Sequence, residues 1–419
     1  RLRRVANNRK SRLPVHFPVQ HLLLHSHADL LIGLHDHRSW VPMKTSIPSS
    51  PLPVRTASPV VGFEKAKLLA AEFGTPTLAV SRSRLQSAYR EMKSALPDVE
   101  LFYAAKANTD VAILRTLFLE GASVDVCSYR EMQSALLAGF RPDQMIHTHP
   151  CKTRDNTRSC YTEGLRWFTF DCEAEIDKHR CGAPDAKTLL RLRADSSSSL
   201  INLSDKFGCA VSDAPALARR AIARGLDVRA LSFHVGSQCV NPHDFRMILN
   251  RTREVWDECI VAGCPLEMLD IGGGFPAPYR SSVLPLDGYC RHLAGALDAT
   301  FGDLDIRIIA EPGRALCAEA VTLVTRVIGK SIRNGVRWYI VDDGVYGSFS
   351  GKLFDQADFP IVAEDADLRP RSPCVVAGPT CDSHDVVALD QELPHLEIGE
   401  LLLVPTMGAY TSASASGFN

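Results

Sequence analysis

The feature that most constrains the fold is a series of short apolar runs that alternate with helix-like segments through the middle of the chain. Helical spacing over Val111–Glu120, Ala214–Arg224 and Phe245–Ala262 falls between several of these runs. Strands that alternate with helices predict parallel βα units, and eight such units can close into a (β/α)8 barrel. The eight predicted strands are Glu100–Ala105, Ser123–Cys127, Met145–Thr148, Trp167–Phe170, Thr188–Arg193, Val228–Phe233, Glu267–Ile271 and Ile306–Ala310.

Polar residues end almost every one of these runs. In barrels of this kind the chemistry lies at the C-terminal ends of the strands. Packing does not explain why charged residues stop apolar runs so regularly, so we predict an active site at this face. The residues at the strand ends are Lys106, Asp125, His147, Asp171, Arg191 or Arg193, His234, Gly272–Gly274 and Glu311.

A β-rich region begins after about residue 318, where the alternation of strands and helices stops. On the N-terminal side of the barrel, helical spacing over Phe63–Phe73 precedes a strand over Thr77–Val80, which could join the barrel. The predicted fold class is therefore α/β, a (β/α)8 barrel plus a β-rich C-terminal domain. The strands predicted for that domain are Val321–Ile328, Trp338–Val341, Cys374–Ala377 and Glu400–Val404.

Residues 1–59 form an irregular N-terminal segment. Residues 1–42 hold seven Lys and Arg, two Asp, no Glu and six of the 14 His. This composition fits an organelle-targeting peptide, and the histidines could bind metal, although their spacing matches no known ligand pattern. We favour a third interpretation, in which this stretch is not native and translation starts at Met43. Residues 45–59, with four Pro and four Ser, are typical of a flexible lead-in.

Composition excludes several classes of protein. Lys and Arg number 47 and Asp and Glu 48, which argues against a nucleic-acid or polybasic membrane partner. No run approaches the roughly 18 apolar residues of a membrane-spanning helix. The 13 cysteines include no Cys-x-x-Cys pair, which disfavours a disulfide framework or a zinc ribbon and predicts reduced thiols in the cytoplasm. We expect no metal site.

Lys106 and the glycines after Asp270 are the first two candidates for chemistry. Lys106 ends an apolar strand, and desolvation there is expected to lower the pKa of its amine and make it a nucleophile toward aldehydes. The glycines of Asp270–Pro276 (DIGGGFP) let backbone N–H groups approach a phosphate, although they do not form the dinucleotide-binding fingerprint. The structural alternatives are a lysine that reaches solvent from a strand end and a tight turn.

Further candidates complete a set of groups suited to one cofactor. Glu311, at a strand end, could hold a protonated pyridine nitrogen, and Arg314 could hold a phosphate. His234 could stack on an aromatic ring, and Ser237 could donate to a phosphate. The alternatives are a salt-bridged loop and a buried core histidine. With a nucleophilic lysine and a phosphate cradle, these groups together predict pyridoxal phosphate as the cofactor.

Two acidic positions in the β-rich region are less informative by themselves. Cys381 and Asp382, in GPTCDSHD, place a thiol beside a carboxylate, but an Asp-capped turn explains the same residues. Asp355, after Lys352-Leu-Phe, is by itself typical of a plain surface acid.

From about Thr77 to Asn419 the chain resembles the alanine-racemase-fold, pyridoxal-phosphate-dependent amino-acid decarboxylases, and within them the ornithine-specific branch most closely. The resemblance implies a cofactor-binding barrel over residues 86–317. It also implies a β-rich domain, made of residues 60–85 and 318–419, that contributes to a dimer active site. The matching segments, in order, are FYAAKAN, SVDVCSYREMQ, THPCK, FTFDCEAE, LRLRADSSSSLINLSDKFG, SFHVGSQ, LDIGGGFP, AEPGR, DDGVYGSFSGKLFD, GPTCDSHD and MGAYTSASAS.

The resemblance also implies a role for each matching residue. Lys106 forms the Schiff base, Glu311 pairs with the pyridinium nitrogen and His234 stacks on the ring. Cys381 protonates the product after CO₂ leaves, and Asp355 and Asp382 hold the distal amino group of the substrate. Phosphate ligands are Ser237, Gly273, Gly274, Arg314 and Tyr410, while Asp125, Arg191 and Glu131 support the pocket.

The expected reaction is decarboxylation of L-ornithine to putrescine in polyamine synthesis, by a homodimer in which Cys381 and Asp382 reach the partner's site. Lysine or dual lysine/ornithine decarboxylation is the main alternative. A non-catalytic homologue that acts as a binding protein is less favoured because the cofactor-site residues and Cys381 and Asp382 are all present. A racemase is less favoured because Asp355 and Asp382 would then have no evident role. Asp355 and Asp382 would place two carboxylates at the distal end of the substrate, which disfavours diaminopimelate because its distal end also carries a carboxylate. Diaminopimelate decarboxylases typically have Cys-Glu-Ser where this chain has Cys381-Asp-Ser.

Three departures from the family pattern concern the site and the end of the chain. Ala107 and Phe354 stand where Cys and Tyr are expected, and Phe354 bears on pocket size and hence on ornithine against lysine. Family members continue past the segment that matches residues 416–419, so the resemblance implies a further strand beyond Asn419.

Overall fold

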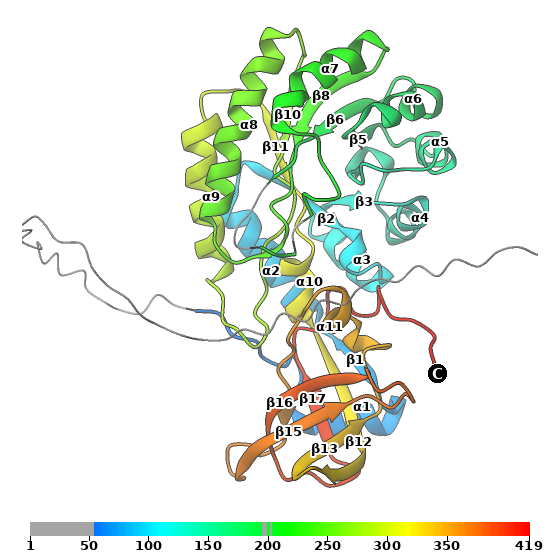
Figure 1. Ribbon diagram of the computed structural model, residues 1–419, viewed down its shortest axis with the longest axis vertical. Coiled ribbons are helices and arrows are strands. Elements are labelled where there is room, and N and C mark those ends of the chain that lie inside the picture. The colour runs from blue at the N-terminus through cyan, green and yellow to red at the C-terminus, as the bar shows by residue number, and fades with distance from the viewer. Residues whose placement is uncertain (1–53, 195–198, 202) are drawn as a thin grey trace, which may run out of the picture. The chain divides into compact units, whose positions relative to one another are not determined.

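The computed structural model of the protein describes residues 54–194, 199–201 and 203–419 (Figure 1). The three interpretations of residues 1–42 lie outside the described residues, as does most of the Pro- and Ser-rich stretch that follows them. None of the helices over the described ranges combines the length and apolar character that a bilayer crossing needs.

Eight parallel strands close into a barrel in the order β10-β11-β2-β3-β4-β5-β6-β8. The predicted barrel is confirmed, and each of its eight predicted strands agrees with an observed one to within two residues at each end. The barrel strands are β2 (Val99–Ala104), β3 (Ser123–Val126), β4 (Met145–His147), β5 (Trp167–Phe170), β6 (Lys187–Arg191), β8 (Asp227–Ser232), β10 (Met268–Asp270) and β11 (Arg307–Ala310).

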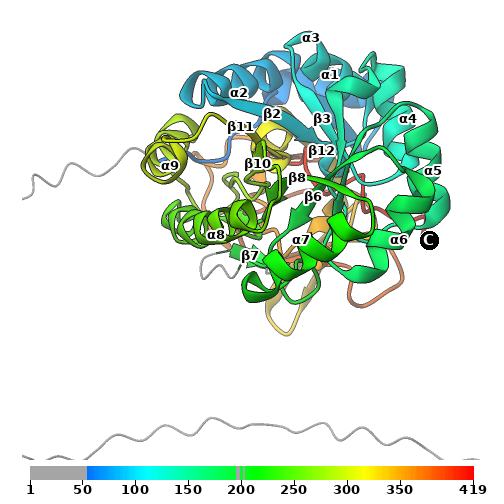
Figure 2. The ribbon, with the colours of Figure 1, turned by 90° about the horizontal axis from the view of Figure 1, so that it is seen from above.

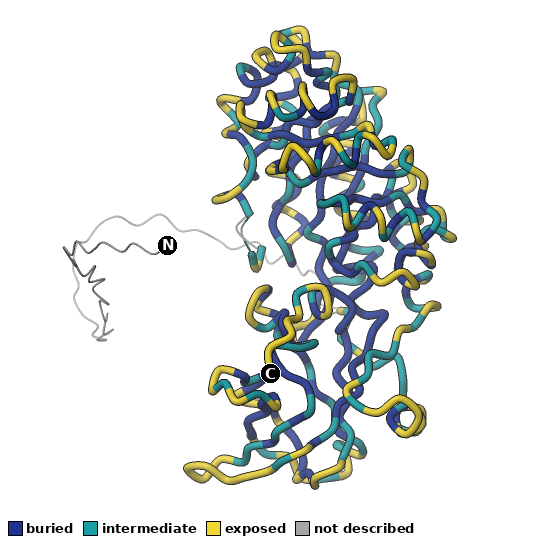
Figure 3. The backbone as a smooth tube through the Cα atoms, turned by 90° about the vertical axis from the view of Figure 1, so that its right-hand side faces the viewer, coloured by how far each residue is buried: buried dark blue, intermediate teal, exposed yellow. Residues whose placement is uncertain are grey.

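Helices surround the barrel, as the view along its axis shows (Figure 2). Each helix buries one face against the strands and exposes the other (Figure 3). The helices are α2 (Arg82–Ala95), α3 (Val111–Leu119), α4 (Tyr129–Ala138), α5 (Arg154–Thr162), α6 (Glu173–Gly182), α7 (Ala214–Ala223), α8 (His243–Val261) and α9 (Leu286–Phe301).

Helix α4 illustrates how local sequence sets these boundaries. The Ser128 hydroxyl accepts a hydrogen bond from the Glu131 amide and so caps the first turn. Gly139 ends the helix in the left-handed conformation, with φ of 109°, where a side chain would be strained. Between these caps, Met132, Ala135 and Ala138 recur at helical spacing and are fully buried.

A seven-stranded sheet forms the second domain, in the order β14-β17-β12-β13-β15-β16, with β1 paired to β12. Strand β1 (Thr77–Val80) therefore joins this sheet and not the barrel, because Thr77 pairs antiparallel with Val324. The other strands are β12 (Val321–Arg333), β13 (Val336–Val341), β14 (Val362–Ala363), β15 (Arg371–Ala377), β16 (Val386–Pro394) and β17 (Leu401–Val404). The remaining α-helices and strands of the described residues are α1 (Phe63–Phe73), α10 (Arg314–Cys317) and α11 (Gly351–Phe354), and a two-stranded antiparallel sheet of β7 (Ser199–Ile201) and β9 (Ser237–Cys239).

Strand β16 is not among the predicted strands. It lies at the end of the sheet order, and its exposed Asp390 and Glu392 break the apolar run by which the other strands are recognised. Polar side chains of this kind are common on edge strands, because one side of such a strand faces water.

The barrel register brings the polar strand ends to one level. Ala104, two residues before Lys106, pairs with Asp125, and Arg191 and Asp270 both pair with Ser232. Beneath this level, one apolar residue from each of six strands forms a separate buried cluster, which comprises Phe102, Ile146, Leu189, Ala230, Met268 and Ile309. Such a layer of side chains gives the polar ends a packed floor.

Two histidines are buried beside the barrel strands. His147 and His179 are fully buried, and each ring packs near Phe168, at centroid distances of 5.9 Å and 5.8 Å. Burial and the nearby Lys152 lower the pKa of His147 to about 3 and that of His179 well below its usual value. Both rings are therefore neutral in the folded protein.

We expect the folded protein to lose stability as the pH falls below about 6.5, because the unfolded chain then binds protons that buried His147 and His179 do not. Between about pH 7.5 and pH 5, His179→Leu should lose about 2 kcal/mol less unfolding free energy than the unsubstituted protein. Urea unfolding at the two pH values measures this difference. His292→Leu, at an exposed histidine, is the control, and equal losses in all three proteins would contradict the assignment.

Candidate active site

A cavity of about 480 Å³ opens at the C-terminal ends of the barrel strands, where residues of the β-rich domain also line it. It contains ten of the predicted site residues: Lys106, Arg191, His234, Ser237, Gly273, Gly274, Glu311, Arg314, Asp355 and Tyr410. Asp125 lies directly behind Lys106. Of the other strand-end residues, His147 turns away from the cavity and contacts Asn156, and Asp171 accepts from the Gly208 amide.

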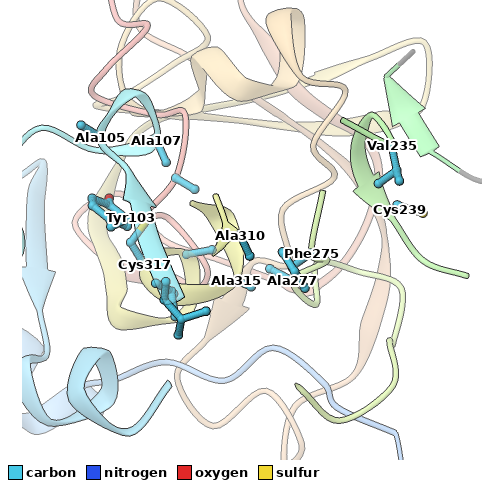
Figure 4. Close-up of a cluster of buried hydrophobic side chains, with 14 of the residues drawn as sticks. Tyr103, Ala105, Ala107, Val235, Cys239, Phe275, Ala277, Ala310, Ala315 and Cys317 are labelled. Carbon is cyan, nitrogen blue, oxygen red and sulfur yellow. The ribbon is translucent and has the colours of Figure 1, made fainter. Parts of the chain in front are cut away.

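A short turn after β2 holds Lys106 in place. Its neighbours Ala105 and Ala107 are buried in the apolar cluster under the site, which also contains Tyr103 and Cys317 (Figure 4). The Tyr103 hydroxyl donates to the Asn108 carbonyl at 3.0 Å and closes the turn. The lysine backbone is therefore fixed while its amine reaches the cavity.

The Lys106 amine is paired with two buried carboxylates. Its Nζ lies 2.6 Å from Asp125 Oδ2 and 3.5 Å from Glu311 Oε2. Burial lowers the pKa of Lys106, as expected from the sequence, but Asp125, Cys127 and Glu311 outweigh burial and raise it well above its usual value. The expectation of a lowered pKa is therefore wrong, because it treats the lysine without its counter-ion.

Three carboxyl groups, Asp125, Asp270 and Glu311, lie buried here with Lys106 as their cation. Burial opposes ionisation of Asp125, but Lys106 outweighs it and lowers the pKa. Burial, Asp270 and Asp125 raise the pKa of Glu311 well above its usual value, and burial raises that of Asp270 to about 6. The cluster thus holds more acidic groups than one cation can balance.

Thr148 gives geometric evidence for a proton in this cluster. Its Oγ1 lies 2.6 Å from Asp125 Oδ1 and 2.9 Å from Glu311 Oε2. One hydroxyl carries one hydrogen, so two such contacts require that one carboxyl group is protonated. The raised pKa of Glu311 assigns that proton to Glu311.

Two glycines form a cradle beside the carboxyl groups. A Cβ atom on Gly273 would lie 2.7 Å from the Glu311 carbonyl oxygen and 3.1 Å from His234 Nε2. Gly274 has φ of 107°, and a Cβ atom there would lie 2.5 Å from the Gly236 carbonyl oxygen. Only glycine leaves this wall of the cavity open to a ligand.

Arg314 is the positive charge at this wall. Its guanidinium donates to Ser237 Oγ at 2.8 Å, to Asp355 Oδ2 and to the Tyr279 hydroxyl. It also lies 4.8 Å from the centre of the Tyr410 ring. Its Nε is buried without a partner among the described residues, so the group retains capacity for an anion.

His234 lies between the carboxyl cluster around Lys106 and the wall formed by the glycines and Arg314, and its imidazole ring is neutral. Its Nδ1 accepts from the Gly236 amide at 3.0 Å, which places the ring hydrogen on Nε2. Burial, together with the charges of Arg191 and Lys106, lowers the pKa of His234 well below its usual value. A neutral imidazole is suited to stacking on an aromatic ring.

These groups fit pyridoxal phosphate. Glu311 lines the cavity, and Asp270 behind it has a fully buried Oδ2 without a hydrogen-bond partner among the described residues, so a cationic N–H group such as a pyridinium beside Glu311 would balance the excess of acid. The glycine cradle, Ser237 and Arg314 suit a phosphate. Lys106 is the amine within reach of an aldehyde between them.

Glu131 lies outside the cavity lining and holds the backbone near Lys106. Its Oε2 accepts from the Cys127 amide at 2.7 Å, and Cys127 lines the cavity. Burial raises the pKa of Glu131. Its predicted supporting position thus matches its contacts with the turn after β3.

Cys381 and Asp382 do not line the cavity. Cys381 is exposed, and Asp382 accepts from the Tyr346 hydroxyl and from the His384 amide. These contacts lower the pKa of Asp382 to about 2. Within a single chain, the two residues are therefore not brought together with Lys106.

Sequence reasoning missed four cavity residues or their direct supports: Thr148, His149, Asp270 as an acid, and Tyr279. Thr148 and His149 directly follow β4, so the strand-end rule finds them once the end of the strand is placed at His147. Asp270 ends β10, as the other site acids end their strands. Tyr279 follows the glycine loop and carries no comparable signal.

The fold and the site define a barrel enzyme with a buried lysine and an anion cradle, and comparisons with known proteins place it in a family. Residues 82–318 match the family described as "Pyridoxal-dependent decarboxylase, pyridoxal binding domain". The chain belongs to this family of pyridoxal-phosphate-dependent ornithine, lysine and arginine decarboxylases. It is an amino-acid decarboxylase whose cofactor is pyridoxal phosphate.

Individual relatives span most of the chain. It is 36% identical to a lysine/ornithine decarboxylase of Selenomonas ruminantium, over 85% of this chain and 90% of the relative. It is 35% identical to an ornithine decarboxylase of Panagrellus redivivus, over 82% and 83%. A lysine/ornithine decarboxylase from Vibrio vulnificus, solved with putrescine, superposes with a TM-score of 0.78 at 38% identity, over 85% and 96%.

Gly273→Ala should weaken binding of pyridoxal phosphate at least about ten-fold, because its methyl group would enter the cradle beside Glu311 and His234. Titration followed by cofactor absorbance measures the affinity. Gly295→Ala is the control, because this helical glycine has no atom within 4 Å of the added Cβ. Equal affinities of the two variants would show that the cradle does not hold the cofactor.

Proposed function

We propose that the protein decarboxylates L-ornithine to putrescine and CO₂, as a step of polyamine synthesis. The observation that carries this proposal is the placement of Lys106, Glu311 and the Gly273–Arg314 anion cradle in one cavity, with buried Asp125 paired to Lys106 behind it. Relatives named for ornithine and for lysine/ornithine, at 35–36% identity, support the substrate class. Lysine, or both amino acids, is the alternative substrate.

The residues predicted to bind the cofactor lie where each could contact one part of pyridoxal phosphate. Arg314, Ser237, Gly273, Gly274 and Tyr410 hold the phosphate. Glu311 would pair with the ring nitrogen, His234 would stack on the ring, and Asp125 and Arg191 would support the site. When bound, pyridoxal phosphate supplies an aldehyde for amines and a ring that takes up the electrons released as CO₂ departs.

Asp125 and its neighbours control the protonation state of the Lys106 amine. The Lys106 amine reacts with an aldehyde only in its neutral form, and Asp125 Oδ2, 2.6 Å away, holds the ammonium form in place until that proton is lost. Glu311, which shares the Thr148 hydroxyl with Asp125, carries a proton, so the site does not accumulate three negative charges. The cavity walls confine the substrate near this amine.

The distal end of the substrate carries a second ammonium group, and Asp355 is an acceptor for it. Arg314 engages Oδ2 of Asp355, whereas no donor among the described residues contacts Oδ1. Asp382 is the second predicted acceptor, and Cys381 is the predicted proton donor to the α-carbon. Both are supplied to the cavity from a second copy of the chain, since neither lines the cavity of its own chain.

Phe354 is the residue we connect with substrate length. It lines the cavity beside Asp355 and is 66% exposed, so its ring can occupy different amounts of the space near the distal amine.

A cytoplasmic location is supported by the cysteines: all 13 lie in the described residues and are free thiols.

The proposal predicts CO₂ release from L-ornithine by the cofactor-loaded protein, with L-lysine measured in parallel. Lys106→Ala should reduce turnover by at least about a thousand-fold, because it removes the amine that exchanges with the substrate. Lys187→Ala, at a half-exposed lysine on the opposite end of a barrel strand, should leave turnover unchanged. Faster release from lysine would select the alternative substrate, and no release from either would refute the function.

Mixing two inactive variants tests the shared site. Lys106→Ala and Cys381→Ala chains should together recover about a quarter of the unsubstituted activity, because a mixed dimer then contains one intact site of two. Each variant mixed with itself is the control. No recovery in mixed dimers isolated through a different affinity tag on each variant would mean that each chain uses its own Cys381.

A further inference from the structure

One corner of the cavity gathers hydrogen-bond donors around a single aromatic ring, that of Phe207. The His149 ring meets it edge-on, with centroids 5.4 Å apart and an angle of 77° between the planes. The Arg191 guanidinium carbon lies 5.4 Å from the same centroid, and Lys206 Nζ lies 5.0 Å from it. Phe207, His149 and Arg191 all line the cavity that contains Lys106.

His149 is held so that one N–H remains for a ligand. Its Nδ1 accepts from the Cys151 amide at 3.1 Å, which places the ring hydrogen on Nε2. Nothing in the described part of the chain accepts from Nε2. Buried Lys152 anchors this loop by donating to the carbonyls of His149, Pro150 and Thr169.

The imidazole is neutral. Burial, followed by the charges of Lys152, Lys106 and Arg191, lowers the pKa of His149 to about 4. The ring therefore offers a hydrogen bond without adding a full charge to a corner that already contains Arg191.

This corner has donors but no matching acceptor. Among the described residues, no carboxylate pairs with Arg191, whose guanidinium lies over the Phe207 ring. The acids in and behind the cavity are engaged elsewhere: Asp125 and Glu311 lie beside Lys106, and Asp355 contacts Arg314. Unpartnered donors that face one cavity are suited to an anionic group of a ligand.

We propose that His149, supported by Arg191, binds the α-carboxylate of the amino-acid substrate and thereby positions the bond that breaks. The inference rests on the proposed function, in which the α-amine reacts at Lys106, so the carboxylate on the same carbon lies close to this amine. His149 and Arg191 are the donors on the adjoining wall, whereas Asp355 repels a carboxylate at the other end.

A neutral donor suits this task better than a second cation. The carboxylate loses its negative charge as CO₂ leaves, so a strong ion pair would stabilise the bound substrate more than the transition state. The His149 N–H orients the carboxylate with a smaller penalty of this kind. Arg191 remains occupied in part by stacking on Phe207.

The test compares a ligand that has the carboxylate with one that lacks it. His149→Ala should raise KM for L-ornithine about ten-fold, since a hydrogen bond to a charged group is lost. It should change inhibition by putrescine less than about two-fold, because the diamine has no carboxylate. His149→Gln, which keeps an N–H donor, should recover most of the affinity, and His292→Ala is the matched control at an exposed histidine.

Binding provides a readout that does not depend on turnover. Calorimetric titration with L-ornithine and with putrescine, on cofactor-loaded proteins that also carry Lys106→Ala to prevent turnover, should show a loss in His149→Ala for the amino acid alone. If His149→Ala weakened binding of both ligands equally, or weakened binding of neither, the inference would be overturned. If the unsubstituted protein binds but does not decarboxylate ornithine, the proposed function fails, while the difference between the ligands still decides the role of His149.

Discussion

The ion pair between Lys106 and Asp125, enclosed by two further acids, is the interaction on which the rest of the site depends. Buried charges are tolerated only when they are paired and hydrogen-bonded. Here Thr148 bridges Asp125 and Glu311, and the packed alanines beside Lys106 keep the amine at 2.6 Å from its partner. The remaining excess of acid gives the cavity its preference for a cationic ring nitrogen.

The barrel supplies this arrangement because a closed parallel sheet brings distant residues to one level. Asp125, Arg191, Asp270 and Glu311 come from four different strands, yet each follows or ends a strand that the register aligns. The β-rich domain adds Asp355 and Tyr410 from above. Separate walls thus serve a phosphate, a ring nitrogen and, as we propose, a carboxylate.

Much of this could be predicted from the sequence, and the exceptions have physical reasons. The barrel strands are short, apolar and bounded by polar residues, so they are recognisable from pattern alone. Strand β16 is not, because its solvent-facing Asp390 and Glu392 hide the pattern. The partner of β1 is also hidden, because pairing with β12 depends on residues about 240 positions away along the chain.

Chemical state was harder to predict than position. Sequence reasoning places Lys106 in the cavity but assigns the wrong direction to its pKa, since the sign depends on a carboxylate 19 residues later in the chain. His147 and His149 illustrate the same limit: of two histidines at one strand end, only His149 faces the cavity. Side-chain direction at a strand end is decided by tertiary contacts.

The pairing of β1 with β12 has a consequence for how the chain acquires its structure. During synthesis β1 emerges first, but its partner follows only after the whole barrel has been made. Most barrel helices and strands contact elements that are near them in the sequence, so they can assemble in order. Strand β1, in contrast, has no strand to pair with until β12 has been synthesised. The β-rich sheet is therefore the last unit to close, and the cavity, which needs Asp355 and Tyr410, is completed only in that final step.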